Sequence, residues 1–377
     1  MNHVLIFSTA YLPLIGGAEV AMKEITDRLP DIHFDLYCAK IQRGLPTTER
    51  IGNVMVHRVG FGHRFDKFLL PIIGPLWALI KPSGSEDRIV WSLLASYGGF
   101  AALVYTWLMP RTNMVLTLQE GDPLEHYAQR AGWFTSLHKQ VFVRANVVHA
   151  ISKFLGDWAV KMGFKGTPII IPNGVDVERF AKRISTEERQ SRRAALGVAP
   201  SDVVLVTVSR LSLKNGVDDL IRSLTKLPSA YKALLIGEGE DRQKLEVLTQ
   251  QKELKDRVIF LGAKDHSELP ALLQASDVFV RPSLSEALGN SFLEAMAAGV
   301  PIVGTPVGGI PDFLMDGETG VFCQPRDPDS IAQAVMRIQT EAGLKEKIVE
   351  HASRIVKEKY EWNQIADQIG SMLEKTV

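Results

Sequence analysis

The chain has 377 residues, of which 46% are hydrophobic and 23% are charged, and its 43 basic and 43 acidic residues balance to a formal net charge of zero. This length favours two domains of roughly 150 to 200 residues each, because single cores rarely grow beyond about 250 to 300 residues. The balanced charge and the absence of a basic run with interleaved aromatic residues argue against a nucleic-acid partner, and the composition is that of a globular protein.

Cysteine usage and the first residues point to the cytoplasm. Cys38 and Cys323 lie far apart and show no metal-type spacing, which suits a reducing compartment and two small core side chains. The N-terminal residues lack the basic start of a signal peptide and are typical of a first strand.

Short apolar runs alternate with amphipathic stretches, a pattern that predicts parallel sheets wrapped by helices. The expected strands are residues 4–8, 34–39, 54–59, 89–91, 115–118, 147–151, 169–171, 203–208, 232–236, 258–261, 278–281, 302–304 and 320–322. The expected helices are residues 18–29, 98–108, 134–143, 153–162, 218–227, 241–251, 266–274, 291–298 and 360–373. A break between domains is expected at residues 172–176, followed by a charged surface connection over residues 178–193.

A glycine pair, Gly16 and Gly17, follows the first strand, and Glu19 comes in the first turn of the next helix. Adjacent glycines let a backbone approach a ligand closely, and a carboxylate is favoured at a helix N-terminus. The Gly-x-Gly-x-x-Gly spacing of a dinucleotide site is absent. Taken alone, such a pair is most often only a turn.

The most apolar segment runs from Phe68 to Ile80 and contains two prolines and a glycine. It is too short to span a bilayer, which takes about 20 residues. It could contact a membrane surface or line an apolar groove, and a buried loop is slightly favoured over either.

Carboxylates also follow the strand at residues 115–118, where Glu120 comes directly after Gln119 and Asp122 follows two residues later. Either carboxylate could bind a hydroxyl group of a ligand, and a loop cap by Asp122 before Pro123 is equally plausible. His149 lies in an apolar strand, where a histidine is more often a satisfied core residue than a ligand.

Two cations, Arg210 and Lys214, follow the strand at residues 203–208, and Asn215 comes next. Near a loop-to-helix junction such cations can bind a diphosphate, arginine in a bidentate manner and lysine as a point charge. A solvated basic loop is the alternative. Gly237 and Gly262 follow the next two strands, and the Gly-x-Gly that begins at Gly237 by itself predicts only a tight turn.

The most informative stretch runs from Pro282 to Asp312, with Glu286 and Glu294 on either side of a glycine-bearing turn that opens a helix. The first N–H groups of a helix lack partners and the helix dipole is positive there, so this turn predicts an anion site. Two flanking carboxylates suit a ligand with phosphate and hydroxyl groups, such as a nucleotide-sugar. The alternatives are a capping box formed by Ser291 and Glu294 and a solvated loop carboxylate at Glu286.

This string resembles the donor-site segment of retaining glycosyltransferases of the GT-B fold, fourth sequence family, also called glycosyl transferases group 1. The positions that match the family pattern are Glu286, Gly289, Glu294, Ala295, Ala297, Gly299, Pro301, Gly308, Gly309 and Pro311. The resemblance covers most of the chain and is strongest from Ile171 to Gly320.

The resemblance implies an α/β protein with two Rossmann-like domains facing across a cleft. An acceptor-binding domain would comprise residues 1–172, and the C-terminal helix within residues 360–377 would pack back on it. A nucleotide-sugar-binding domain would comprise residues 173–359.

Site residues carried over from the family fall into three groups. The catalytic residues would be Arg210, Lys214 and Glu286. The donor-binding residues would be Gly17, Asn215, Gly237, Gly262, Gly289, Asn290, Ser291 and Glu294. The acceptor-binding residues would be Glu19, Glu120 and Asp122.

The chain departs from the family pattern at two places. Where the family has Arg-Leu, three residues and Lys-Gly, this chain has Asn215 at the lysine position, and Lys214 is the expected substitute. Many members have His-Asp where this chain has Gln119 and Glu120.

The expected function is transfer of a sugar, with retention, from a nucleotide-sugar to a glycan, lipid-linked or small-molecule acceptor, as in polysaccharide or glycolipid biosynthesis. No cofactor and no obligatory metal is expected, and Asp327 before Pro328 predicts a helix cap rather than a metal-binding pair. A cytoplasmic hexosyltransferase is expected, and peripheral contact with the membrane through the segment from Phe68 to Ile80 is a hypothesis. The alternatives are a nucleotide-sugar-binding scaffold without turnover and a nucleotide-sugar epimerase or phosphorylase, and the missing glycine fingerprint disfavours a nicotinamide dehydrogenase.

Overall fold

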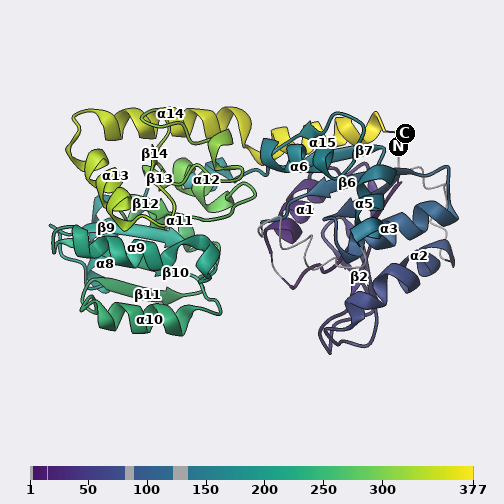
Figure 1. Cartoon of the computed structure of the whole chain (residues 1–377), viewed down its shortest axis with the longest axis horizontal. Coiled ribbons are helices and arrows are strands. Elements are labelled where there is room, and N and C mark those ends of the chain that lie inside the picture. Colours follow the sequence, from purple (N-terminus) through teal and green to yellow (C-terminus); the bar gives the residue numbers. More distant parts are fainter. Residues whose placement is uncertain (1–2, 15, 81–88, 122–134, 377) are drawn as a thin grey trace. The chain divides into compact units, whose positions relative to one another are not determined.

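The computed structural model describes residues 3–14, 16–80, 89–121 and 135–376, and it divides into two compact units (Figure 1). Unit 1 comprises Met1–Asn173 and Trp362–Val377, and unit 2 comprises Gly174–Glu361. The sequence analysis placed the two passages after residues 172 and 359, whereas the structure places them after residues 173 and 361. Each unit contains a mostly parallel sheet wrapped by helices, so the expected α/β class with two Rossmann-like domains is confirmed.

Within its described residues, unit 1 has an eight-stranded sheet in the order β3-β4-β2-β1-β5-β6-β7-β8. Its strands are β1 (His3–Ser8), β2 (His33–Ala39), β3 (Thr48–Ile51), β4 (Val54–Val59), β5 (Ile89–Leu93), β6 (Asn113–Leu118), β7 (Val147–Ala150) and β8 (Ile169–Ile170). Among the strands that the structure describes, the edge strand β3 alone is antiparallel, and its polar sequence explains why the apolar pattern did not predict it. The strand order reverses between β1 and β5, where open α/β sheets bind ligands beyond the carboxyl ends of their strands.

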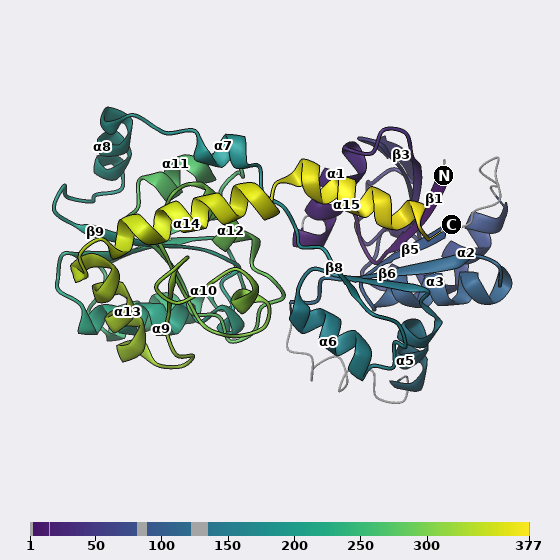
Figure 2. The same ribbon diagram turned by 90° about the horizontal axis from the view of Figure 1, so that it is seen from above.

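Helices cover both faces of this sheet (Figure 2). They are α1 (Gly17–Asp27), η1 (Asp66–Phe68), α2 (Leu70–Ile80), α3 (Tyr97–Leu108), α5 (Thr135–Arg144), α6 (Lys153–Lys161) and α15 (Trp362–Glu374). On one face, α1 and α15 pack in one core with Val4 and Ile6 of β1. Phe7 points to the other face, where its ring lies 5.8 Å from that of Tyr37 and 5.9 Å from that of Tyr105 on α3. This alternation is the period-2 pattern of a strand buried on both sides.

The apolar segment from Phe68 to Ile80 is a helix and not the buried loop that the sequence analysis favoured. Pro71 lies in the first turn of α2, where its missing N–H is tolerated, and Pro75 lies inside the helix. The packing of α2 against α3 outweighs the poor helix propensity of proline and glycine. One side of α2 remains exposed, with Ile72 63% and Ile80 77% accessible.

Unit 2 has a six-stranded parallel sheet in the order β11-β10-β9-β12-β13-β14, among the residues described. Its strands are β9 (Val203–Val208), β10 (Tyr231–Ile236), β11 (Val258–Gly262), β12 (Val278–Arg281), β13 (Ile302–Gly304) and β14 (Val321–Phe322). Its helices are α7 (Val177–Ala181), α8 (Thr186–Ala195), η3 (Leu213–Asn215), α9 (Val217–Ser223), η4 (Leu224–Lys226), α10 (Arg242–Gln251), α11 (Leu269–Gln274), α12 (Asn290–Ala297), η5 (Ile310–Asp312), α13 (Pro328–Thr340) and α14 (Leu344–Lys359). In sequence order this is the 3-2-1-4-5-6 arrangement of nucleotide-binding sheets, with its reversal between β9 and β12.

The charged stretch over residues 178–193 lies mostly at the surface, but it forms most of α7 and α8, which the sequence analysis did not predict. Arg189 Nη2 lies 2.7 Å from Asp277 Oδ1 and Arg193 Nη1 lies 3.0 Å from Asp277 Oδ2, just before β12. The Arg193 side chain is only 5% exposed. The charges therefore hold α8 on unit 2, which a one-dimensional pattern cannot show.

The two cysteines and the apolar helices can be compared with the sequence analysis. Cys38 and Cys323 are free and buried, as expected of core residues. No helix in the described ranges combines the length and the apolar character needed to cross a membrane.

Candidate functional site

The candidate site lies in unit 2 at the carboxyl ends of β9 and β12, where the strand order reverses. The loop from Ser209 to Gly216 leaves β9, and the loop from Pro282 to Gly289 leaves β12. Leu284 donates its backbone N–H to the carbonyl of Lys214 at 2.7 Å, so the two loops are joined. The sequence-predicted groups of both loops thus share one edge of the sheet.

In the first loop, Arg210 is exposed and Asn215 is buried. Asn215 Nδ2 donates to the Arg210 carbonyl at 2.6 Å and to Ser212 Oγ at 3.3 Å. Asn215 therefore shapes the turn that carries Arg210, a role that the sequence did not reveal. Lys214 is half-buried in the 3₁₀ turn beside it.

Gly216 closes this loop onto the second one. Its φ is +67°, and a Cβ atom at this position would lie 2.0 Å from the Pro282 carbonyl oxygen. Only glycine fits that backbone conformation and that approach. The contact brings the start of α9 against the end of β12.

In the second loop, Glu286 is 9% exposed and is not the solvated carboxylate of the alternative interpretation. Its Oε2 lies 2.5 Å from Arg281 Nη2, and its Oε1 accepts from the Ala287 N–H at 3.1 Å. The carbonyl of Glu286 accepts from the Gly309 N–H at 3.1 Å, so the glycine pair after β13 packs on its backbone. Glu286 is therefore held from three sides.

Arg281 is a site residue that the sequence analysis missed. It ends the otherwise apolar run of β12, and a cation in that position was the signal that could have identified it. Its Nη1 donates to Ser291 Oγ at 2.9 Å, and its Nη2 donates to Asn215 Oδ1 at 3.0 Å.

The first turn of α12 shows no capping box. Gly289 is the N-cap with φ of +97°, and it has no side chain that could cap the helix. Ser291 Oγ instead accepts from Arg281, and α12 has no acidic residue in its first turn. The N–H groups at Asn290 and Ser291 thus retain the positive end of the helix dipole for an anion.

Glu294 lies one turn further along α12, with its side chain 13% exposed. Its Oε1 is 2.8 Å from Nε2 of His266, whose own side chain is 50% exposed. The sequence analysis did not single out His266, because the contact joins residues 28 positions apart.

Gly237 and Gly262 meet beyond the ends of β10 and β11. Gly237 donates its N–H to the Gly262 carbonyl at 2.8 Å. A Cβ atom on Gly237 would lie 2.0 Å from the carbonyl oxygen of Ser209, so the loops after β9 and β10 are in backbone contact.

In unit 1, the predicted residues lie beyond the carboxyl ends of β1 and β6. Gly17 is exposed at the start of α1, and burial raises the pKa of Glu19, whose carboxylate accepts backbone hydrogen bonds at Gly16 and at its own N–H. Glu120 is 3% exposed, and Asp122 lies outside the described residues.

The carboxyl group of Glu120 accepts two backbone hydrogen bonds. The Ala95 N–H donates to Oε1 at 2.7 Å, and the Gln119 N–H donates to Oε2 at 2.9 Å. Burial nevertheless raises the pKa of Glu120 to about 7, because desolvation outweighs the hydrogen bonds to the ionised form. It can therefore exchange a proton near neutral pH.

His149 is a satisfied core residue, as the sequence analysis favoured. Its Nε2 donates to the Ile171 carbonyl at 2.7 Å, and its Nδ1 lies 2.9 Å from Thr117 Oγ1, which accepts from Trp91 Nε1. Burial lowers the pKa of His149 to about 4, so the ring is neutral at physiological pH.

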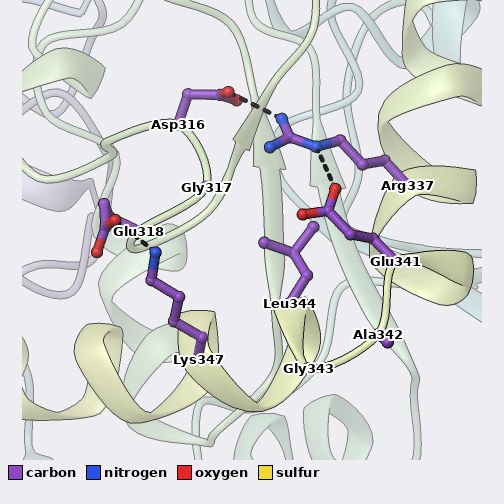
Figure 3. Close-up of a pocket in the computed structure, with 9 residues that line it drawn as sticks. All are labelled: Asp316, Gly317, Glu318, Arg337, Glu341, Ala342, Gly343, Leu344 and Lys347. Atoms are coloured by element: carbon purple, nitrogen blue, oxygen red, sulfur yellow. Dashed lines mark hydrogen bonds and ion pairs between the residues drawn. The ribbon is translucent and has the colours of Figure 1, made fainter.

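A separate pocket of about 420 Å³ lies near the amino end of β14 and contains none of the predicted residues (Figure 3). Arg337 pairs there with Asp316 at 2.8 Å and with Glu341 at 2.9 Å. Lys347 pairs with Glu318 at 2.5 Å. Each of its two cations is paired with a carboxylate, and these charges do not converge on a shared ligand position.

The acidic residues around Pro328 form a helix cap, as predicted. Asp327 accepts from the Ser330 N–H at 3.0 Å, and Pro328 occupies the first position of α13. Among the residues described, no group of three or more histidine, cysteine, aspartate or glutamate side chains could hold a metal ion.

Two family models match the two halves of the chain. The model described as Glycosyl transferases group 1 matches residues 188–355, and the model described as Glycosyltransferase Family 4 matches residues 15–179.

Similar proteins are found both by sequence and by structure. An uncharacterized glycosyltransferase of Methanocaldococcus jannaschii is 36% identical over 201 residues, which cover 53% of this chain and 52% of that protein. A GDP-mannose-dependent alpha-(1-6)-phosphatidylinositol monomannoside mannosyltransferase of Mycolicibacterium smegmatis is 34% identical over 203 residues, 51% of this chain and 52% of that protein. Each of these alignments spans about half the length of the relative.

The crystal structure of Anabaena HepE in complex with UDP and glucose is similar over the full length of both chains, with a TM-score of 0.83 and 21% identity. At this identity the likeness shows the fold alone.

Proposed function

The chain belongs to the glycosyltransferases of the GT-B fold known as glycosyl transferases group 1, and from this premise we propose that it transfers a sugar from a nucleotide-sugar to an acceptor hydroxyl with retention of configuration. The observation that carries the proposal is the junction of β9 and β12. There Arg210, Glu286 and the uncapped first turn of α12 share the edge at which nucleotide-binding sheets bind their ligands.

We propose that the donor diphosphate binds at the N-terminus of α12, where the first N–H groups and the helix dipole favour an anion. Arg210 and Lys214 would balance the charge that develops on the diphosphate as the glycosidic bond breaks. The departing phosphate would accept the acceptor's proton on the same face of the sugar.

We propose that the carboxylates of Glu286 and Glu294 bind hydroxyl groups of the donor. Glu286 would accept from hydroxyls of the transferred sugar, and Glu294 from those of the ribose. Around the nucleoside, the backbone at Gly237 and Gly262 would approach the base, while Glu19 and Glu120 of unit 1 would bind the acceptor. No obligatory metal is proposed, because the chain supplies its own cations for the leaving group.

The proposed acceptor is a lipid-linked glycan or a glycolipid at the cytoplasmic face of the membrane. The exposed apolar side of α2 supports this proposal, and the Mycolicibacterium smegmatis relative is named for a phosphatidylinositol acceptor. Nucleotide-binding measurements must identify the donor base, because backbone contacts to a base leave little trace in the sequence.

The experiment that tests the proposal is binding of UDP, GDP, ADP and their sugar conjugates by calorimetry and thermal shift, with and without EDTA. Selective, EDTA-insensitive binding of one nucleotide is expected, followed by sugar transfer once an acceptor is supplied. Binding without turnover on any acceptor would favour the scaffold, and a changed sugar without an acceptor would favour an epimerase. No binding by any of these nucleotides would contradict the proposal.

A pair of variants tests the assigned residues. Arg210→Ala is expected to lower kcat by about 10² to 10³, because it removes a cation from the leaving group while the fold stays intact. Glu286→Ala is expected to lower turnover to a similar extent. The control is Arg222→Ala, which changes an exposed arginine on α9. Near wild-type activity in Arg210→Ala or Glu286→Ala would refute the assignment.

A further inference from the structure

Arg281 is a largely buried cation in the candidate site that the mechanism above does not use. It is the last residue of β12, and its side chain is 12% exposed. Burying a guanidinium is costly unless its charge and its N–H groups find partners. The contacts of the Arg281 side chain therefore indicate its role.

Three elements hold the guanidinium group in place. Nη2 donates to Asn215 Oδ1 at 3.0 Å, from the loop after β9, and Nη1 donates to Ser291 Oγ at 2.9 Å, from the first turn of α12. Nη2 also lies 2.5 Å from Glu286 Oε2. The positive charge thus lies between the loop after β9 and the helix N-terminus that is proposed to receive the diphosphate.

One donor of this group remains uncommitted. Nε of Arg281 is buried and has no hydrogen-bond partner in the part of the chain that the structure describes. The ring of Phe292 lies 5.9 Å from the guanidinium carbon, so that the guanidinium is supported by an aromatic side chain. Buried donors without partners are rare in folded proteins, and here such a donor belongs to a cation beside an anion site.

We propose that Arg281 contacts the donor diphosphate and is the cation that compensates for the neutral side chain at Asn215. Asn215 is then a positioning residue, since its carbonyl oxygen accepts from Arg281 and its amide shapes the loop of Arg210. A lysine at 215 would repel Arg281 across this 3.0 Å contact, so an amide and a guanidinium are the compatible pair. This inference rests on the proposed function and adds Arg281 to Lys214, the substitute that the sequence analysis expected.

Glu286 gains a second role from the same contact. Its Oε2 neutralises Arg281 and its Oε1 accepts from the Ala287 N–H, so the carboxylate is held in one orientation toward the sugar position. Arg281 therefore connects the recognition of the diphosphate with that of the transferred sugar.

The test compares the affinity for a nucleoside diphosphate with that for the corresponding monophosphate, by calorimetry on the full chain. The probes are UDP and UMP, GDP and GMP, or ADP and AMP, whichever pair the wild type binds. Arg281→Gln is expected to weaken diphosphate binding roughly 10- to 100-fold, since it removes a charged donor, and to change monophosphate binding little. Adding Asn215→Lys to Arg281→Gln is expected to restore most of the loss, because it places a cation at residue 215, which is in hydrogen-bond contact with residue 281.

The control is Arg337→Gln, which removes an arginine from the pocket near the amino end of β14 and is expected to leave both affinities unchanged. If Arg281→Gln does not fold, Arg281→Lys keeps the charge but loses the planar fork, and a severalfold loss confined to the diphosphate is still expected. Equal loss for both nucleotides, or an unchanged ratio, would overturn the inference while the proposed function stands. If the wild type binds no diphosphate, the proposed function fails and the inference fails with it.

Discussion

At the residue scale, Glu120 shows how burial sets the protonation state of a carboxyl group. It is 3% exposed, and the pKa is raised from 4.5 to about 7 mainly by desolvation. Because the folded-state pKa lies above the unfolded value, the stability contributed by the protonated form is fully present below pH 4.5. This contribution is lost as pH rises through 7.

Replacing Glu120 with glutamine is therefore expected to stabilise unit 1 at alkaline pH relative to wild type. Between pH 4.5 and 8.5, the difference in the free energy of unfolding between Glu120→Gln and wild type should change in favour of the variant. The expected change is on the order of 3 kcal/mol, from about 1.4 kcal/mol per unit of pKa. Thermal unfolding across this pH range measures it, with the exposed Asp31→Asn of the same unit as the control. A difference that is independent of pH would show that Glu120 is ionised throughout.

At the element scale, α2 is a helix with an apolar side that faces solvent. The large exposed side chains on α2 and directly before it are Phe61, Phe65, Phe68, Ile72, Ile73, Leu76 and Ile80, here called the α2 patch. The patch carries basic residues as well, because Arg64 lies 5.3 Å from the ring of Phe65 and Lys67 lies 5.4 Å from that of Phe68. Exposed aromatic and aliphatic side chains beside cations suit an anionic lipid surface.

A charge in the α2 patch is expected to release the protein from anionic vesicles. Ile72→Glu should weaken binding to phosphatidylglycerol-containing vesicles about tenfold or more, since burying one such side chain is worth about 2 kcal/mol. Co-sedimentation measures this, and Val247→Glu on α10 is the matched control because Val247 is also exposed. Absence of wild-type binding, or equal binding by both variants, would argue for a soluble acceptor.

At the scale of the whole molecule, unit 1 is built from two distant segments of the chain. The C-terminal helix α15 places Ile365, Ile369 and Leu373 in the core formed with α1 and the sheet. Asn113 Nδ2 at the start of β6 donates to the Thr376 carbonyl at 2.6 Å. The expected return of the C-terminal helix to the first domain is thus observed in the contacts of unit 1.

Truncating Ile369 is expected to destabilise unit 1 and spare unit 2. Ile369→Ala removes a fully buried side chain and should cost about 2 to 5 kcal/mol. Hydrogen exchange should accelerate in β1 and α1 and stay unchanged in β9, because the core of unit 2 contains no residue of α15. Gln368→Ala, at an exposed position of the same helix, is the control. Equal acceleration in both units would mean that they unfold together.

The strands of both sheets apart from β3, most of the helices and the segment from Pro282 to Asp312 could be predicted from the sequence alone. A strand that is buried on both faces of a parallel sheet has a continuous apolar sequence, as residues 203–208 do. Such a strand can therefore be predicted from a short stretch of sequence. The turn before α12 is equally local, since glycine, asparagine and serine specify a helix start within a few residues.

Only the tertiary structure could decide which side chains meet at the site. Arg281 contacts Asn215 from 66 positions away, and His266 contacts Glu294 from 28 positions away, so no spacing rule relates them. The packing of α2 on α3 likewise made a helix of a segment whose prolines argued against one. Local propensity and burial are properties of a short stretch of chain, whereas charge pairing and helix packing depend on distances that exist only after folding.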